Sequence, residues 1–175
     1  MAYSVLIAGE IAAKNIDSLN KFGKATFEVG NGHVVALGDK SNVKGENDVY
    51  NVNKPANAAT DIFYMVNEPV NVLVNGKYSG LTDDPREFNI PDGKVFTMYK
   101  PMVGDEIVIT EDGLEGKKNN EGVTNTYVVP ECGKTKLKWA ANDTGVSLAY
   151  KHVGDTYVSI GNERVEAYRF ICVKA

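Results

Sequence analysis

Histidine is the side chain that most often acts as a general base near neutral pH, and the chain contains two, His33 and His152. His33 follows the turn-forming residues 30–32, and His152 directly precedes a Val-Gly-Asp sequence. We therefore expect both imidazoles at the surface beside turns. No carboxylate stands at ligand spacing from the two histidines, so the sequence predicts neither a catalytic histidine nor a transition-metal site.

Paired carboxylates are another common catalytic arrangement, and adjacent acidic residues occur at Asp83-Asp84 and Glu111-Asp112. Each pair stands near Pro or Gly, and neighbouring residues point apart, so we expect solvated turn carboxylates. A weak calcium site in one of these loops stays open, although the spaced oxygen ligands of an EF-hand are missing. Because the chain also lacks Gly-x-Ser-x-Gly, Walker and Rossmann patterns, we expect no enzymatic activity and no cofactor.

The sulfur and indole side chains have structural interpretations as well. Cys132 and Cys172 are far apart and form no Cys-x-x-Cys pattern, so we expect two buried thiols rather than a disulfide. In residues 136–140, alternation along a strand places Leu137 and Trp139 on the opposite face from the lysines. We expect Trp139 to pack in the core, and a carbohydrate platform built on this ring is the alternative.

The composition describes one soluble domain. The 175 residues are 43% hydrophobic and 24% charged, which is enough apolar material for a single well-filled core. A formal net charge of -4 argues against a nucleic-acid partner, because phosphate binding needs clustered Lys and Arg. The first ten residues contain a short apolar run without a basic start, so they predict neither a secretory signal nor a membrane span, and we expect synthesis in the cytoplasm.

Short β-prone segments separated by turn signals occur throughout the chain. Residues 27–29 and 34–37 flank an Asn-Gly turn at 30–33, which predicts a hairpin. A strand is predicted at 61–66, and it is followed by another at 70–74 with Asn-Gly at 75–76. Residues 88–90 and 95–99 predict a hairpin or a tight connection. Near the end, residues 156–160 and 164–173 predict a closing hairpin around Gly161-Asn162.

Helix signals are few, and one short phrase recurs. Residues 11–22 place Ala12, Ile16 and Leu19 on one face, which predicts a short helix, and residues 110–115 predict a single turn after a strand. The phrase Val-Gly-Asp occurs at 103–105 and again at 153–155, each time before a β-branched alternating run. We interpret both copies as turns that open a strand.

These segments predict a mainly β protein, a small antiparallel β-barrel or sandwich with an N-terminal arm and at most one or two short helices. Residues 1–22 form the arm or short helix, and residues 23–175 form a single β-rich domain. The small, weakly patterned residues 54–60 mark a possible internal seam.

Several phrases, in order, cover most of the chain: residues 30–38 (GNGHVVALG), 45–50 (GENDVY), 61–69 (DIFYMVNEP) and 102–110 (MVGDEIVIT), the last leading into 112–116 (DGLEG). With these phrases the chain resembles small structural proteins encoded among the head genes of tailed bacteriophages, which are usually taken as capsid decoration proteins. Such proteins commonly have an arginine followed by an aromatic residue before the Gly-Asp phrase, where this chain has Met98-Tyr99-Lys100.

The resemblance implies a protein of the virion that binds the outer face of the major capsid lattice, as a homo-oligomer, and stabilises the head. It implies no catalytic residue, no nucleic-acid partner and no membrane partner. We expect Tyr3, Val5, Leu6 and Ile7 in the apolar N-terminal segment to contact the capsid or a sister subunit by strand addition, and the alternative is that they complete the protein's own sheet. Another virion component of the tail or baseplate, and a carbohydrate-binding module, are the alternative functions.

Overall fold

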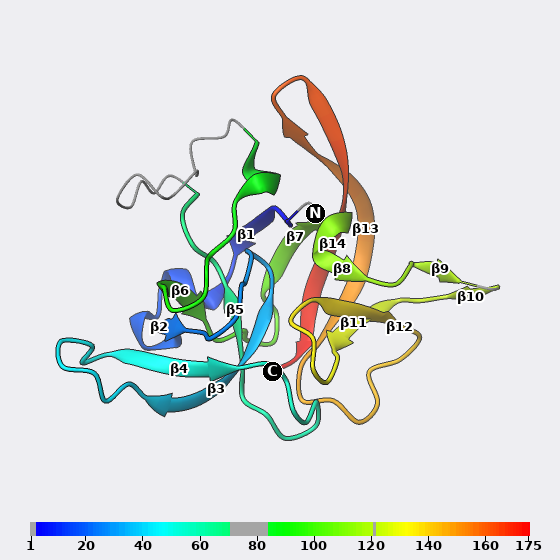
Figure 1. The fold of residues 1–175 in the computed structure, drawn as a ribbon. Helices are drawn as coiled ribbons and strands as arrows, with labels where there is room; N and C mark the ends of the chain where they lie inside the picture. The colour runs from blue at the N-terminus through cyan, green and yellow to red at the C-terminus, as the bar shows by residue number, and fades with distance from the viewer. Residues whose placement is uncertain (1–2, 71–83, 121) are drawn as a thin grey trace.

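The computed structural model describes residues 3–70, 84–120 and 122–175. The described chain is mainly β, as predicted, and it contains 3-10 turns but no α-helix. Its strands form a closed five-stranded barrel and a seven-stranded mixed sheet, with a small separate hairpin (Figure 1). No helix in these described ranges is long and apolar enough to cross a membrane.

The barrel is built from five strands between residues 20 and 99, in the order β2-β4-β3-β5-β6. It closes because β6 pairs antiparallel with both β5 and β2. The β2–β4 pair is parallel, and the other pairs of the barrel are antiparallel. The strands are β2 (Asn20–Lys24), β3 (Val34–Lys40), β4 (Val49–Asn53), β5 (Phe63–Val66) and β6 (Val95–Tyr99).

The sheet takes its first strand from the N-terminus and the other six from the second half of the chain, in the order β1-β7-β14-β13-β11-β12-β8. Its longest pair is the β13–β14 hairpin, whose tip extends beyond the rest of the sheet in Figure 1. The strands are β1 (Leu6–Glu10), β7 (Glu106–Thr110), β8 (Leu114–Glu115), β11 (Tyr127–Pro130), β12 (Leu137–Ala140), β13 (Ala149–Ile160) and β14 (Glu163–Lys174). Within the described ranges, the strands β9 (Asn119–Asn120) and β10 (Val123–Thr124) form a separate two-stranded sheet.

The start of β3 and the whole of β5 join the barrel to the sheet, because the side chains on both faces are buried there. On β3, Val34 packs into the core that the barrel shares with the sheet, whereas Val35 packs inside the barrel. Strand β5 alternates in the same way, with Met65 in the shared core and Tyr64 in the barrel interior. Continuous apolar runs without polar alternation are typical of strands buried on both faces, and this pattern explains residues 34–37 and 63–66.

The predicted helix at residues 11–22 is wrong. Two 3-10 turns, Ala12–Lys14 and Asp17–Leu19, replace it, and neither has a side-chain N-cap. Ile16, which the helical pattern placed on an apolar face, is 47% exposed. Strand β2 begins directly after the second turn, so residue 22, the expected end of the arm, lies inside a barrel strand.

The predicted first hairpin is also wrong, although its turn forms. The His33 amide donates to the Gly30 carbonyl oxygen over 3.2 Å, yet the segments on either side do not pair with each other. Val29 instead forms a bridge with Ile90, and β3 pairs with β4 and β5. Residues 88–99 therefore make a tight connection rather than a hairpin, because Ile90 is paired with Val29. These long-range pairings override the local Asn-Gly signal.

The closing hairpin is confirmed, with Ile160 opposite Glu163 across the Gly161-Asn162 turn. The predicted turn after β7 is confirmed as the 3-10 turn Glu111–Gly113. The strand at 61–66 is present as β5. Most of the strand at 70–74 and the Asn-Gly at 75–76 lie outside the described residues.

The two Val-Gly-Asp copies differ in conformation. Gly104 has a φ of +99° and forms the expected turn before β7. Gly154 lies inside β13, at a register shift between His152 and Gly154 that marks a β-bulge, so the second copy is not a turn. The predicted strand start at residue 156 is thus too late, and β13 begins at Ala149.

Candidate functional site

His33 is a buried residue, and its predicted surface position is wrong. The side chain is 5% exposed, and its Nδ1 atom accepts a hydrogen bond from the Gly30 amide over 3.2 Å. The Thr135 hydroxyl lies 3.0 Å from the same nitrogen. Burial lowers the pKa of His33 to about 4, so the ring is neutral at pH 7 with its proton on Nε2. Among the described residues, Nε2 has no hydrogen-bond partner.

His152 lies in strand β13 and not beside a turn. Its ring packs edge-on against Trp139, with 5.6 Å between the ring centroids. Its Nε2 atom lies 2.8 Å from Oδ1 of Asp155, whose carboxylate also accepts from the Lys118 ammonium over 2.6 Å. The Lys118 contact, the largest cause, and His152 lower the pKa of Asp155. Trp139 is 5% exposed, as predicted, so its ring offers no carbohydrate platform.

The other candidate groups also have structural roles. Asp84 accepts from the guanidinium of Arg86 over 2.6 Å, which lowers the pKa of the carboxyl, whereas Asp83 lies outside the described residues. Both cysteines are free, as predicted, but only Cys172 is buried and Cys132 is exposed. Within residues 3–70, 84–120 and 122–175, no group of three His, Cys, Asp or Glu side chains is placed to hold a metal ion.

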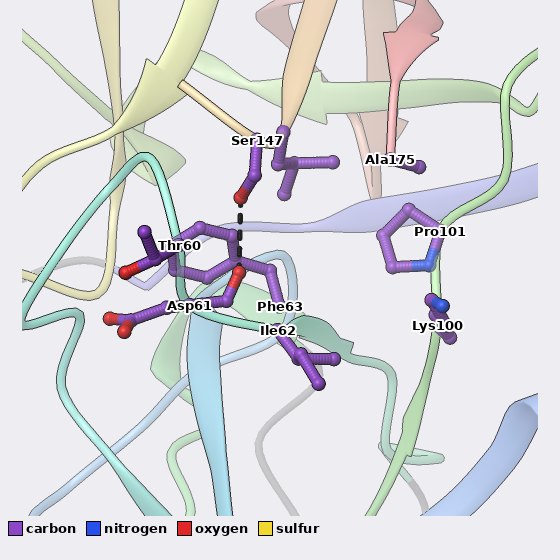
Figure 2. A pocket seen from close by; sticks show the side chains of 9 residues that line it. Thr60, Asp61, Ile62, Phe63, Lys100, Pro101, Ser147 and Ala175 are labelled. Carbon is purple, nitrogen blue, oxygen red and sulfur yellow. Dashed lines mark hydrogen bonds between the residues drawn. The ribbon is translucent and has the colours of Figure 1, made fainter. Parts of the chain in front are cut away.

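A pocket between the barrel and the sheet has mainly apolar walls, including Phe63, Pro101 and Leu148 (Figure 2). Ser147 also lines it, but its hydroxyl donates to the backbone carbonyl of Asp61 over 3.0 Å. The Asp61 carboxylate points away from this hydroxyl and accepts from the amides of residues 56 and 57. No imidazole lines the pocket, so Ser147 lacks the adjacent base that would activate it as a nucleophile.

Of the four predicted contact residues of the N-terminal segment, Leu6 and Ile7 lie in β1 of the protein's own sheet, and Tyr3 and Val5 lie in the segment directly before it. The Tyr3 hydroxyl donates to Glu28 over 2.8 Å, and the Val5 amide donates to the Thr110 hydroxyl over 2.9 Å. Leu6 packs against the shared core. Ile7 differs from the other three because its side chain is 46% exposed. The alternative that this segment completes the sheet is therefore present in the structure, and a contact with a capsid or sister subunit stays a prediction.

The edge of the sheet at β1 is the most prominent candidate interaction site. Strand β1 pairs with β7 on one side and, among the described residues, with no strand on the other. Ile7, Val108 of β7 and Arg169 of β14 stand at the same register on the outer face of the sheet. They line a shallow hollow of about 130 Å³ together with Glu10 and Glu106. A second hollow shares Gly9 and Glu10 with the first and extends to the 66%-exposed Val103.

Asp105 holds this edge in position. Its carboxylate is 3% exposed and accepts hydrogen bonds from two backbone amides, that of Ala12 over 2.8 Å and that of Met102 over 2.9 Å. The first bond joins the segment after β1 to the turn before β7, and the second closes that turn. Asp105 of the first Val-Gly-Asp copy therefore has a structural role, because its two hydrogen bonds hold these two segments together.

Sequence reasoning selected Ile7 but missed Glu10, Glu106 and Arg169. These residues come together only through the β1–β7–β14 pairing, and no local pattern marks a strand as the edge of a sheet. No protein-family model, curated protein or solved structure matches this chain. The fold and the site are therefore interpreted from their own geometry.

Proposed function

We propose that this protein is a capsid decoration protein of a tailed bacteriophage. In this role it is a non-enzymatic component of the virion surface that binds the outer face of the major capsid lattice as a homo-oligomer and stabilises the head. The observation that carries the proposal is the ordered series of phrases in residues 30–116 that resemble such proteins.

The position of these phrases in the fold supports the proposal. Residues 30–38 include most of β3, residues 61–69 contain β5, and residues 102–110 contain β7. Strands β3 and β5 join the barrel to the sheet, and β7 is the strand on which β1 pairs. Three of the five phrases thus include framework strands, whereas residues 45–50 and 112–116 lie mainly in turns.

The surface of the molecule suits a role in binding a large partner. His33, His152 and Ser147 are held by hydrogen bonds within the fold, which favours a binding role over a catalytic one. The β13–β14 hairpin extends beyond the sheet, with Tyr157 66% exposed (Figure 1). An open strand edge and a projecting hairpin are elements by which a rigid domain can contact a protein lattice, and repetition over the lattice strengthens weak contacts through avidity.

Electron microscopy of undecorated phage heads mixed with the purified protein tests the proposal. We expect regular protrusions at fixed lattice positions and co-sedimentation of the protein with the heads. A sample of the protein without heads, centrifuged in parallel, controls for self-association. Bare heads beside free protein would refute the proposal, and binding to purified tails instead would assign the protein to another part of the virion.

A further inference from the structure

We infer that the outer edge of β1 accepts an extended segment of the capsid protein that carries an apolar side chain beside Ile7 and a lysine or arginine beside Glu10 and Glu106. The identity of this partner as the capsid protein rests on the proposed function. The strand-binding property and the preference for a basic segment rest on the edge itself.

The backbone of β1 provides the first argument. Its residues pair antiparallel with β7, with Leu6 opposite Ile109 and Ile7 opposite Val108. An edge strand presents unpaired amide and carbonyl groups along its outer side, and these groups are a template for another strand. Addition of a strand supplies main-chain hydrogen bonds, while pockets beside the edge select alternate side chains of the incoming segment.

Ile7 provides the apolar part of the site. Its side chain is 46% exposed, and it lies beside the half-buried Val108 on the outer face of the sheet. A β-branched or aliphatic side chain opposite Ile7 on an added strand would cover the exposed Ile7 side chain. Cross-strand apolar pairs of this kind stabilise the pairing of neighbouring strands.

The charges along this edge indicate the chemistry of the partner. Glu10 stands directly opposite Glu106 in the β1–β7 register, and both side chains are exposed. Like charges placed directly opposite on neighbouring strands are destabilising. In the described part of the chain, neither carboxylate forms an ion pair, although Arg169 lines the same hollow. The nearby Lys14 ammonium donates to the Gly9 carbonyl over 2.6 Å instead of pairing with a glutamate. A cationic side chain from outside would relieve the repulsion.

The same charges disfavour a second copy of β1 as the occupant. Residues 6–10 (LIAGE) contain no lysine or arginine. Symmetric pairing of two β1 strands would therefore bring two glutamate pairs to one interface without adding a cation. A basic segment of a different chain satisfies both the open backbone edge and the glutamate pair.

Titration of the full-length protein with two synthetic peptides tests the inference independently of phage heads. The probes are acetyl-Thr-Val-Lys-Val-Lys-Val-Thr-amide and the same peptide with Glu in place of Lys, each followed by NMR of the backbone amides. We expect the basic peptide to shift the amide signals of residues 6–10 and the acidic peptide to leave them unchanged. In the double variant Glu10→Gln, Glu106→Gln, we expect the affinity for the basic peptide to fall about tenfold, whereas Asp39→Asn on β3 leaves it unchanged.

Equal affinity for both peptides, or shifts confined to other residues, would overturn the inference. Binding of the double variant to heads separates the inference from the proposed function. If both the wild-type protein and the variant decorate heads equally well, the decoration role stands and the edge is not the docking site. If the wild-type protein ignores heads but binds the basic peptide at β1, the edge binds basic strands and the decoration role fails.

Discussion

Acidification is expected to destabilise this protein through His33. The folded state holds the pKa of His33 at about 4 through burial, whereas the ordinary value is 6.5. Between these values the unfolded chain binds a proton that the folded chain excludes, so the free energy of unfolding falls as the pH is lowered from 6.5 to 4. Below pH 4 both states are protonated at this site, and its contribution stops changing.

The size of the effect follows from the difference between the two pKa values, since one unit corresponds to about 1.4 kcal/mol. The loss attributable to His33 is about 2 kcal/mol at pH 5 and about 3 kcal/mol at pH 4, relative to pH 7.5. This is a substantial part of the roughly 5–15 kcal/mol by which small domains are stable.

Urea unfolding measures this loss, because the single Trp139 is 5% exposed and its fluorescence reports unfolding. The pair to compare is His152→Gln and the double variant His33→Gln, His152→Gln, so that His33 is the one histidine that differs. Carboxylate titrations are common to both proteins and cancel in the difference. We expect the gap between the two curves to change by about 2 kcal/mol from pH 7.5 to pH 5. Parallel curves over this range would refute the reasoning.

Two further substitutions test the framework by the same unfolding assay at pH 7. Asp105→Asn is expected to lower the free energy of unfolding by about 2–3 kcal/mol, because one of two buried amides loses a charged acceptor. A change below about 0.5 kcal/mol would show that these two hydrogen bonds do not stabilise the fold. Gly38→Ala is expected to cost about 1–3 kcal/mol, since an added Cβ would lie 2.7 Å from the carbonyl oxygen of Asn51. Gly9→Ala, where no atom lies within 4 Å of an added Cβ, is its control, and equal effects of the two would contradict the steric argument.

Local sequence patterns predicted the structure correctly where it depends on a single turn or a single strand. The Gly161-Asn162 pair closes the β13–β14 hairpin, as a two-residue turn between alternating segments does. Alternation around Leu137 correctly placed Trp139 in the core. In the first case the interacting residues are close in the sequence. In the second case the alternation of one strand is enough to predict which side chains are buried.

Local sequence patterns gave wrong predictions where a segment pairs with a strand far away in the sequence instead of with its neighbour. The Asn-Gly turn before β3 forms, but Val29 pairs with Ile90, which is 61 positions further along the chain. His33 resembles a surface residue beside a turn, yet the sheet and barrel enclose it. The two copies of Val-Gly-Asp adopt different conformations, because Gly104 has a positive φ in a turn, whereas Gly154 lies at a β-bulge inside β13.

The sequence by itself determined that the chain is a mainly β protein, because short β-branched runs between turn residues favour strands wherever they lie. It also indicated strands at 34–37 and 61–66, and the structure shows that β3 begins and β5 lies in these runs. Only the tertiary structure decided that these strands form a closed barrel beside an open sheet, and that Ile7, Glu10 and Glu106 meet at the edge of that sheet. Strand order depends on hydrogen bonds between residues far apart in the chain, and a strand at an edge has the same local sequence preferences as one in the interior.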